Sequence, residues 1–145
     1  MVSGEKRDYL MMQIEELGRV LGKILTHILD LKSSTNVIDY KQEISQIFLS
    51  ETIVDFPFIL NSCKNEFEDY ISDKFSNHSE LYVSLAQILY ELSGLESNNQ
   101  KKIELYEKAL ILYQLSIDIS KTFNVEVFNK MKLIHSLLTK LKSTE

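Results

Sequence analysis

The chain has few of the residues that cross-link or interrupt a fold. It has one cysteine, Cys63, which excludes a disulfide within the chain, and the residue's place in an apolar helical stripe predicts a buried, inert thiol. One proline and four glycines leave most of the chain free to be helical. No apolar run approaches the roughly 18 residues of a membrane span, and the first residues are charged, unlike a signal peptide. We therefore expect a cytoplasmic protein that does not enter a membrane.

The charge pattern also differs from that of a nucleic-acid-binding protein. The net charge is −5 at pH 7, and the basic stripe that usually marks a nucleic-acid surface is missing from the sequence. With 145 residues, of which 44% are hydrophobic and 26% charged, the composition is that of one globular domain over 1–145. Abundant lysine, isoleucine and asparagine indicate an AT-rich bacterial genome. We expect no nucleic-acid partner.

Apolar residues at helical spacing run along nearly the whole chain. Over 6–31 they recur at alternating steps of four and three residues and predict a long first helix: Leu10, Ile14, Leu17, Leu21, Ile24, Ile28 and Leu31. Gly18 and Gly22 lie one turn apart on this helix and predict a groove where another backbone approaches closely. We expect the apolar face to pack within the monomer; a weak homodimer is the alternative.

The remaining segments continue the helical pattern. Middle helices are predicted over 36–75, where Asp55 caps a segment over 56–75 that is either one helix or two. Further helices are predicted over 77–142, with a capping box at Asn77. No segment alternates as a strand. The sequence predicts an all-α protein, an antiparallel array of about five to seven helices, with far more helix than the roughly one third of an average globular protein.

No catalytic or metal-binding motif accompanies these helices. The chain has three histidines: His27, His78 and His135. None has a glutamate three residues before it, so the Glu-x-x-His pair of di-iron bundles is absent. Glu66, Asp69 and Asp73 share one helical face, which we interpret as solvated, although whether this face binds anything stays open. The sequence predicts a protein that is not an enzyme and needs no metal or cofactor.

Two of the predicted helices resemble a tetratricopeptide unit. One is similar to the second-helix pattern of that repeat: Leu105-Tyr106-Glu107-Lys108-Ala109-Leu110. The helix before it, predicted to end at Gly94, matches the first-helix spacing: Tyr82, Leu85, Ala86 and Leu89. Ala86 and Ala109 are 23 positions apart. The family spacing is about 19, so the turn between the helices is predicted to be roughly four residues longer.

The tetratricopeptide resemblance implies a superhelix that binds a protein or peptide partner through residues of its first helix. The candidates on this chain are Tyr82, Gln87, Tyr90 and Glu91. The whole chain resembles an uncharacterised bacterial helical family, whose members open with a helix like that over 8–21 and end in tetratricopeptide-like helices. We therefore expect a non-enzymatic protein–protein interaction or scaffold module. The alternative is a helical protein that binds a small molecule or a metal at a site assembled from distant helices.

Overall fold

The protein is a bundle of helices. The computed structural model describes residues 4–32 and 40–143, which contain seven helices and no strand. They are α1 (Gly4–Lys32), α2 (Tyr40–Glu51), α3 (Phe56–Asn61), α4 (Lys64–Phe75), α5 (Ser79–Leu95), α6 (Asn99–Ser120) and α7 (Val125–Ser143). The all-α prediction is confirmed. The first four residues of the region predicted to be helical over 36–75 lie outside the described residues.

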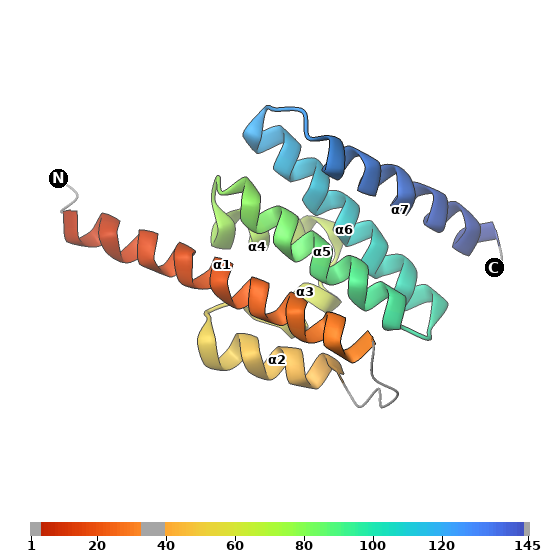
Figure 1. The fold of residues 1–145 in the computed structure, drawn as a ribbon, viewed down its shortest axis with the longest axis horizontal. Helices are drawn as coiled ribbons and strands as arrows, with labels where there is room; N and C mark the ends of the chain where they lie inside the picture. Colours follow the sequence, from red (N-terminus) through yellow and green to blue (C-terminus); the bar gives the residue numbers. More distant parts are fainter. Residues whose placement is uncertain (1–3, 33–39, 144–145) are drawn as a thin grey trace.

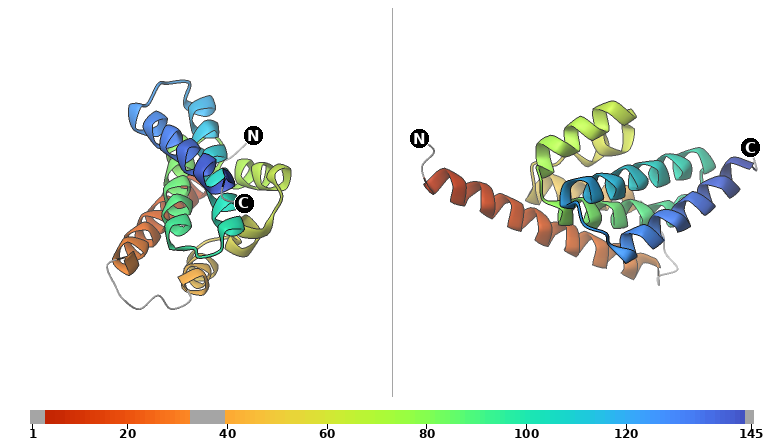
Figure 2. Two further views of the ribbon diagram at one scale, coloured as in Figure 1. Left: turned by 90° about the vertical axis from the view of Figure 1, so that its right-hand side faces the viewer. Right: turned by 90° about the horizontal axis from the view of Figure 1, so that it is seen from above.

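Five of the helices form a row in which each contacts the next. Their order is α2, α1, α5, α6, α7, and α3 and α4 lie behind α5 in the view of Figure 1. The views of Figure 2 agree with this order and show the first turns of α1 extending away from the other helices. This arrangement places α5 and α7 on either side of α6, which creates the groove described below.

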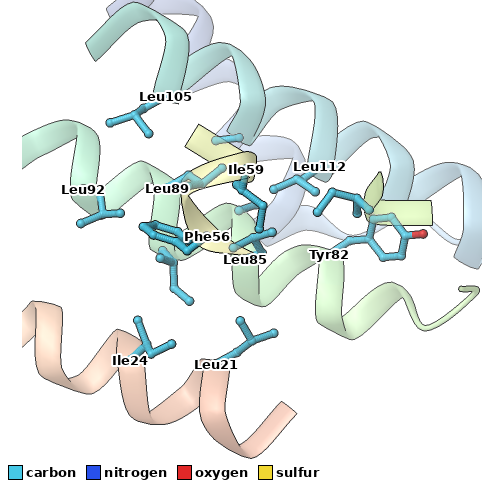
Figure 3. Close-up of a cluster of buried hydrophobic side chains, with 14 of the residues drawn as sticks. Leu21, Ile24, Phe56, Ile59, Tyr82, Leu85, Leu89, Leu92, Leu105 and Leu112 are labelled. Atoms are coloured by element: carbon cyan, nitrogen blue, oxygen red, sulfur yellow. The ribbon is translucent and has the colours of Figure 1, made fainter. Parts of the chain in front are cut away.

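The core lies where α1, α3, α5 and α6 meet. Figure 3 shows Leu21 and Ile24 of α1 pointing towards Phe56 of α3 and Leu85 of α5, and all four side chains are fully buried. Apolar side chains three and four positions apart lie on one helix face, so each helix presents a continuous stripe to this core. Burial of these stripes stabilises the bundle.

The apolar face of α1 packs within the chain, against α5 and α2. Its central members are buried: Leu17, Leu21, Ile24 and Ile28. The side chains of Leu10 and Leu31 lie outside the described part. Val20 is also fully buried, although it is off the seven-residue seam. The buried face is wider than the seam because α1 has a neighbour on each side.

The prediction of a close backbone approach at both glycines of α1 is wrong. A Cβ atom on Gly18 would lie 3.6 Å from Leu81 Cδ2, an ordinary van der Waals contact, and one on Gly22 would meet nothing within 4 Å. We therefore expect Gly22→Ala to raise the free energy of unfolding by about 0.5–1 kcal/mol, because glycine is a poorer helix former than alanine. Chemical denaturation measures this change. A loss of stability would mean that another chain covers this position in solution.

The segment over 56–75 is two helices. Asp55 caps α3 as predicted, since its Oδ1 accepts a hydrogen bond from the Phe58 N–H at 3.1 Å. Ser62 and Cys63 then adopt extended backbone conformations, and α4 begins at Lys64. The prediction of a buried thiol at Cys63 is wrong, because the break turns the residue outward. Its thiol is exposed and donates to Glu66 Oε1 at 3.0 Å.

A buried lysine holds the end of α3. The Lys108 side chain is only 7% exposed, and its Nζ donates to the carbonyl oxygens of Ile59 at 2.7 Å and Leu60 at 2.9 Å. These carbonyls belong to the last turn of a helix, where no backbone N–H follows to bond them. The ammonium group also lies 5.5 Å from the centre of the Phe67 ring. Lys108 of α6 therefore joins α3 and α4 to the central row.

The helices α5 and α6 form a tight antiparallel pair. Ala86 and Ala109 are both fully buried. The prediction of a longer turn is wrong: α5 ends at Leu95 and α6 begins at Asn99, so the extra residues lengthen the helices instead. Gly94 is therefore inside α5 and does not end it. The predicted cap at Asn77 is also wrong, since His78 occupies the N-cap position.

The turn between α5 and α6 carries a partly buried ion pair. Glu96 is almost fully buried, and its Oε2 lies 2.5 Å from Lys41 Nζ of α2. Burial raises the pKa of Glu96, but bonding to Lys41 and to the Asn98 N–H outweighs it, so the pKa lies below its ordinary value. The pair joins α2 to the α5–α6 turn.

We expect this pair to stabilise the fold in a pH-dependent way. A lowered carboxyl pKa contributes stability above the ordinary value of 4.5, and that contribution is lost as pH falls below it. Lys41→Met should therefore lower the free energy of unfolding by about 1–3 kcal/mol at pH 7 and by less at pH 3. Denaturation at both pH values measures the difference. Equal losses of stability at the two pH values would show that Lys41 acts through packing alone. Glu96→Gln, which removes the carboxyl group that titrates, is the control.

Candidate functional site

The site that best fits a binding role is a groove of about 430 Å³ between α5 and α7. We call it the α5–α7 groove, and nine residues line it, among them Val83, Gln87, Tyr113, Val127, Lys130 and Leu133. Of these six, Val83 and Gln87 lie on α5, Tyr113 lies on α6, and the other three lie on α7. The groove forms because α5 and α7 both pack against α6 and leave a space between them.

Local sequence positions α7 at the edge of this groove. Lys121 adopts a left-handed conformation with φ of 57°, and its N–H donates to Ile117 O at 2.8 Å, which ends α6. Asn124 then caps α7, since its Oδ1 accepts from the Val127 N–H at 3.2 Å. The buried side chains of Val127, Ile134 and Leu138 anchor the helix. Lys130 and Leu133, on the neighbouring face, are left to line the groove.

Tyr113 lines the groove, and its hydroxyl group is buried. Its side chain is 1% exposed, and its hydroxyl has no hydrogen-bond partner among the described residues. Burial raises the pKa of Tyr113 far above its ordinary value, and nearby Tyr90 and Glu91 raise it further. The group therefore stays neutral across the physiological range, able to donate one hydrogen bond and accept others.

A second tyrosine, Tyr90, contacts the ammonium group of Lys130, one of the lining residues of the groove. Lys130 Nζ of α7 lies 4.1 Å from the centre of the Tyr90 ring of α5, within the range of a cation–π interaction. The Tyr90 ring lies 5.8 Å from that of Tyr106 on α6. These contacts join α5, α6 and α7. The contact with Tyr90 also holds the positive charge of Lys130 in place.

One of the four predicted partner residues, Gln87, lines the α5–α7 groove. The ring of Tyr90 lies beside the groove, because it contacts the ammonium group of Lys130, and the charge of Glu91 raises the pKa of Tyr113. Tyr82 does not join them. It is 1% exposed, and its hydroxyl donates to Ser76 O at 2.6 Å, so its inclusion among partner-binding residues is corrected.

Tyr82 is instead part of the core because its position on α5 faces inward. Its ring makes an edge contact with Phe75 at 5.6 Å between centroids. The hydroxyl steadies the α4–α5 turn, where Ser76 has a φ of 52°, a conformation that non-glycine residues rarely adopt. First-helix spacing placed Tyr82 on the helix correctly, but it did not distinguish the core face from the groove face.

The sequence interpretation missed Tyr113 and all of the α7 residues in the groove. Tyr113 fell within the apolar stripe predicted for its helix, where an aromatic residue is expected to fill the core. Its hydroxyl was the available signal, since a buried tyrosine hydroxyl usually has a hydrogen-bond partner. Lys130 belongs to no motif of the sequence that indicates a binding site.

The histidines and the acidic face stay apart from the groove. His27 Nε2 of α1 lies 2.8 Å from Glu43 Oε2 of α2 in an exposed pair, and His135 is exposed on α7. Asp69 and Asp73 are exposed on α4. Within residues 4–32 and 40–143, no three His, Cys, Asp or Glu side chains are grouped so as to hold a metal ion.

A second hollow, of about 630 Å³, lies between α1, the 50–54 segment and the end of α4. Apolar side chains such as Met12, Ile14 and Ile53 line much of it, and Met12 and Ile53 are highly exposed. No buried polar atom without a partner lies among its described lining residues. In this it differs from the α5–α7 groove, which Tyr113 lines.

The chain matches no family model, no curated protein and no solved structure. Membership of the bacterial helical family and the tetratricopeptide-like superhelix therefore stay predictions. In the part of the chain that the structure describes, no helix has the length and apolar character needed to cross a membrane.

Proposed function

We propose that this protein is a non-enzymatic interaction module that binds a protein or peptide segment in the α5–α7 groove. The observation that carries the proposal is a groove lined by Gln87, a predicted partner residue, and by Lys130, whose ammonium group lies against the ring of Tyr90, a second predicted partner residue. An open groove with apolar walls and a few polar groups is the usual form of a recognition site. We extend the proposal to a bacterial cytoplasmic protein that is a monomer or a weak homodimer.

The chemistry of the groove favours binding over catalysis. A general base needs a pKa near the working pH, whereas burial keeps the Tyr113 hydroxyl protonated. Gln87 and Asn129 offer neutral amides, which can hold a ligand but do not exchange protons. The charged groups Lys130 and Glu126 line the groove from α7. Such a set of groups recognises a shape and a hydrogen-bond pattern.

A small-molecule ligand is the second candidate. The groove volume of about 430 Å³ falls in the range of roughly 300–1,000 Å³ typical of small-molecule sites. Native mass spectrometry of the purified protein separates the two functions. A stoichiometric bound metabolite or metal would favour this alternative and count against the interaction module.

The decisive experiment compares one substitution at two exposed leucines. Affinity capture followed by mass spectrometry identifies a partner, whose purified form is then titrated by calorimetry. Leu133→Glu places a charge in the groove, and we expect it to weaken binding at least tenfold. Leu49→Glu on α2 makes the same change outside the groove and should leave binding unaltered. Equal affinities of both variants would place the partner elsewhere and contradict the proposal.

A further inference from the structure

We infer that the turn between α6 and α7 binds the surface of an anionic membrane. Exposed apolar side chains of the turn insert among the lipid headgroups, and lysines around them contact the headgroup charges. The expectation that the chain does not enter a membrane rested on the lack of a long apolar run and of a signal peptide, and a surface contact requires neither. The exposure of the apolar side chains, the charge of α7 and the small size of the surface each support the inference.

Three large apolar side chains are exposed where α7 follows α6, and we call them the turn patch. Phe123 is 74% exposed, Val125 59% and Phe128 44%, and none of them lines the α5–α7 groove. The rings of Phe123 and Phe128 lie 5.6 Å apart between centroids. The turn lies at an edge of the bundle, because α7 is the last helix of the row (Figure 1). Adjoining exposed apolar side chains of this kind mark contacts with proteins or membranes.

Local structure holds the turn patch on the outside of the bundle. Lys121 ends α6 in a left-handed conformation, and Asn124 caps α7. Val127, in the first turn of α7, is buried against the other helices. Val125 lies two positions earlier and points to the opposite side of the helix, since each residue turns the helix by about 100°. The patch is therefore already in place in the unbound protein.

The segment that carries the turn patch is basic, although the chain is acidic. Residues 121–143 contain five lysines and one glutamate, a net charge of +4, whereas the whole chain has a net charge of −5. Lys121, Lys132 and Lys140 are exposed, and Lys132 Nζ lies 5.4 Å from the centre of the Phe128 ring. Anionic headgroups attract such lysines. The rest of the chain is acidic, so this end is the one that turns towards the membrane.

The small size of the turn patch favours a membrane over a folded protein. A stable protein–protein interface buries roughly 1,200–2,000 Å² and needs a partner of complementary shape. Three side chains at an edge of the bundle provide only a small part of that area. Lipids pack around an inserted side chain without a preformed shape, and the strength of such binding combines apolar burial with electrostatic attraction. The turn patch and its lysines provide both.

The test is sedimentation of the full chain with lipid vesicles. We expect saturable binding to vesicles of phosphatidylcholine and phosphatidylglycerol. Binding to vesicles of phosphatidylcholine alone should be at least about fivefold weaker, because each lysine near an anionic surface adds to the attraction. Raising the salt concentration from about 0.1 M to 1 M should weaken binding to the anionic vesicles, because salt screens the lysine charges. No binding to the anionic vesicles, or equal binding to both kinds, would overturn the inference.

Matched substitutions locate the contact. Phe123→Ser should weaken binding to the anionic vesicles at least about fivefold, because the turn loses an apolar side chain. Leu49→Ser, at a leucine of α2 that is 76% exposed, should leave binding unaltered. Lys132→Glu should weaken binding as much as Phe123→Ser, whereas Lys64→Glu, the same change at an exposed lysine of α4, should not. All four positions are exposed, so the variants should keep the circular dichroism spectrum and Tm of the wild type. Equal binding by variant and control in either pair would contradict the inference.

A second copy of the chain is the other molecule that could cover the turn patch. Gel filtration without lipid distinguishes this case from membrane binding. We expect the wild type and Phe123→Ser to elute identically. A wild-type dimer that Phe123→Ser converts to a monomer would show that the patch is a subunit interface, and membrane binding at the patch would then be wrong.

Discussion

Ile24→Ala is expected to lower the free energy of unfolding by about 2–5 kcal/mol, because Ile24 is fully buried where α1 meets the core. The loss combines the transfer free energy of the removed methyl groups with the cavity that remains. Urea denaturation followed by circular dichroism measures it. The result tests whether α1 is an integral part of the fold.

A control on the same helix separates the effect of burial on stability from the effect of helix propensity. Leu29 of α1 is 49% exposed, so Leu29→Ala should change stability by no more than about 0.5 kcal/mol. Both variants are measured at two protein concentrations, since unfolding of an obligate dimer would depend on concentration. A concentration-dependent loss at Ile24 would make α1 a subunit interface and contradict its packing within the monomer.

Lys108→Met is expected to lower the free energy of unfolding by about 2–4 kcal/mol. Methionine keeps most of the apolar length of the side chain, but the carbonyl oxygens of Ile59 and Leu60 lose their donor. The same change at the exposed Lys140 of α7 is the control and should have little effect. A stability equal to that of the wild type would mean that the cost of burying the ammonium group cancels its hydrogen bonds.

The stability difference between the wild type and Lys108→Met should also depend on pH. Burial lowers the pKa of Lys108 below its ordinary value of 10.5, and Glu104 opposes this only in part. Between the lowered pKa and 10.5, the unfolded chain binds more protons than the folded one, so folding becomes more favourable as pH rises. The advantage of the wild type should therefore grow from pH 8 to pH 10. A constant difference would contradict the lowered pKa.

The helical character of the chain and the main core positions were predictable from the sequence, because both depend on local spacing. The steps of three and four that join Leu17, Leu21 and Ile24 identify one face of a helix whatever it packs against. The Asp55 cap is local as well. The break at Ser62 was not predictable, since apolar spacing continues across it, and the error at Cys63 follows from that break.

The candidate site depends on tertiary structure, and so only part of it was predictable. Gln87 and Tyr90 belong to one helix and were found through its resemblance to a repeat unit. Tyr113, Lys130 and Leu133 come from two other helices, and nothing in the spacing between them indicates that they meet. Lys108 was missed for a similar reason: its partners lie nearly fifty positions earlier in the chain.

The buried ammonium group of Lys108 also provides a built-in reporter of transient opening. Amine-reactive reagents modify exposed side chains such as Lys101 and Lys140 directly, but they reach Lys108 only when α3 separates from α6. The ratio of these labelling rates, read by peptide mass spectrometry, therefore gives the fraction of molecules in which α3 has detached. Measured with and without a partner, that fraction would show whether binding at the groove tightens the opposite side of the bundle.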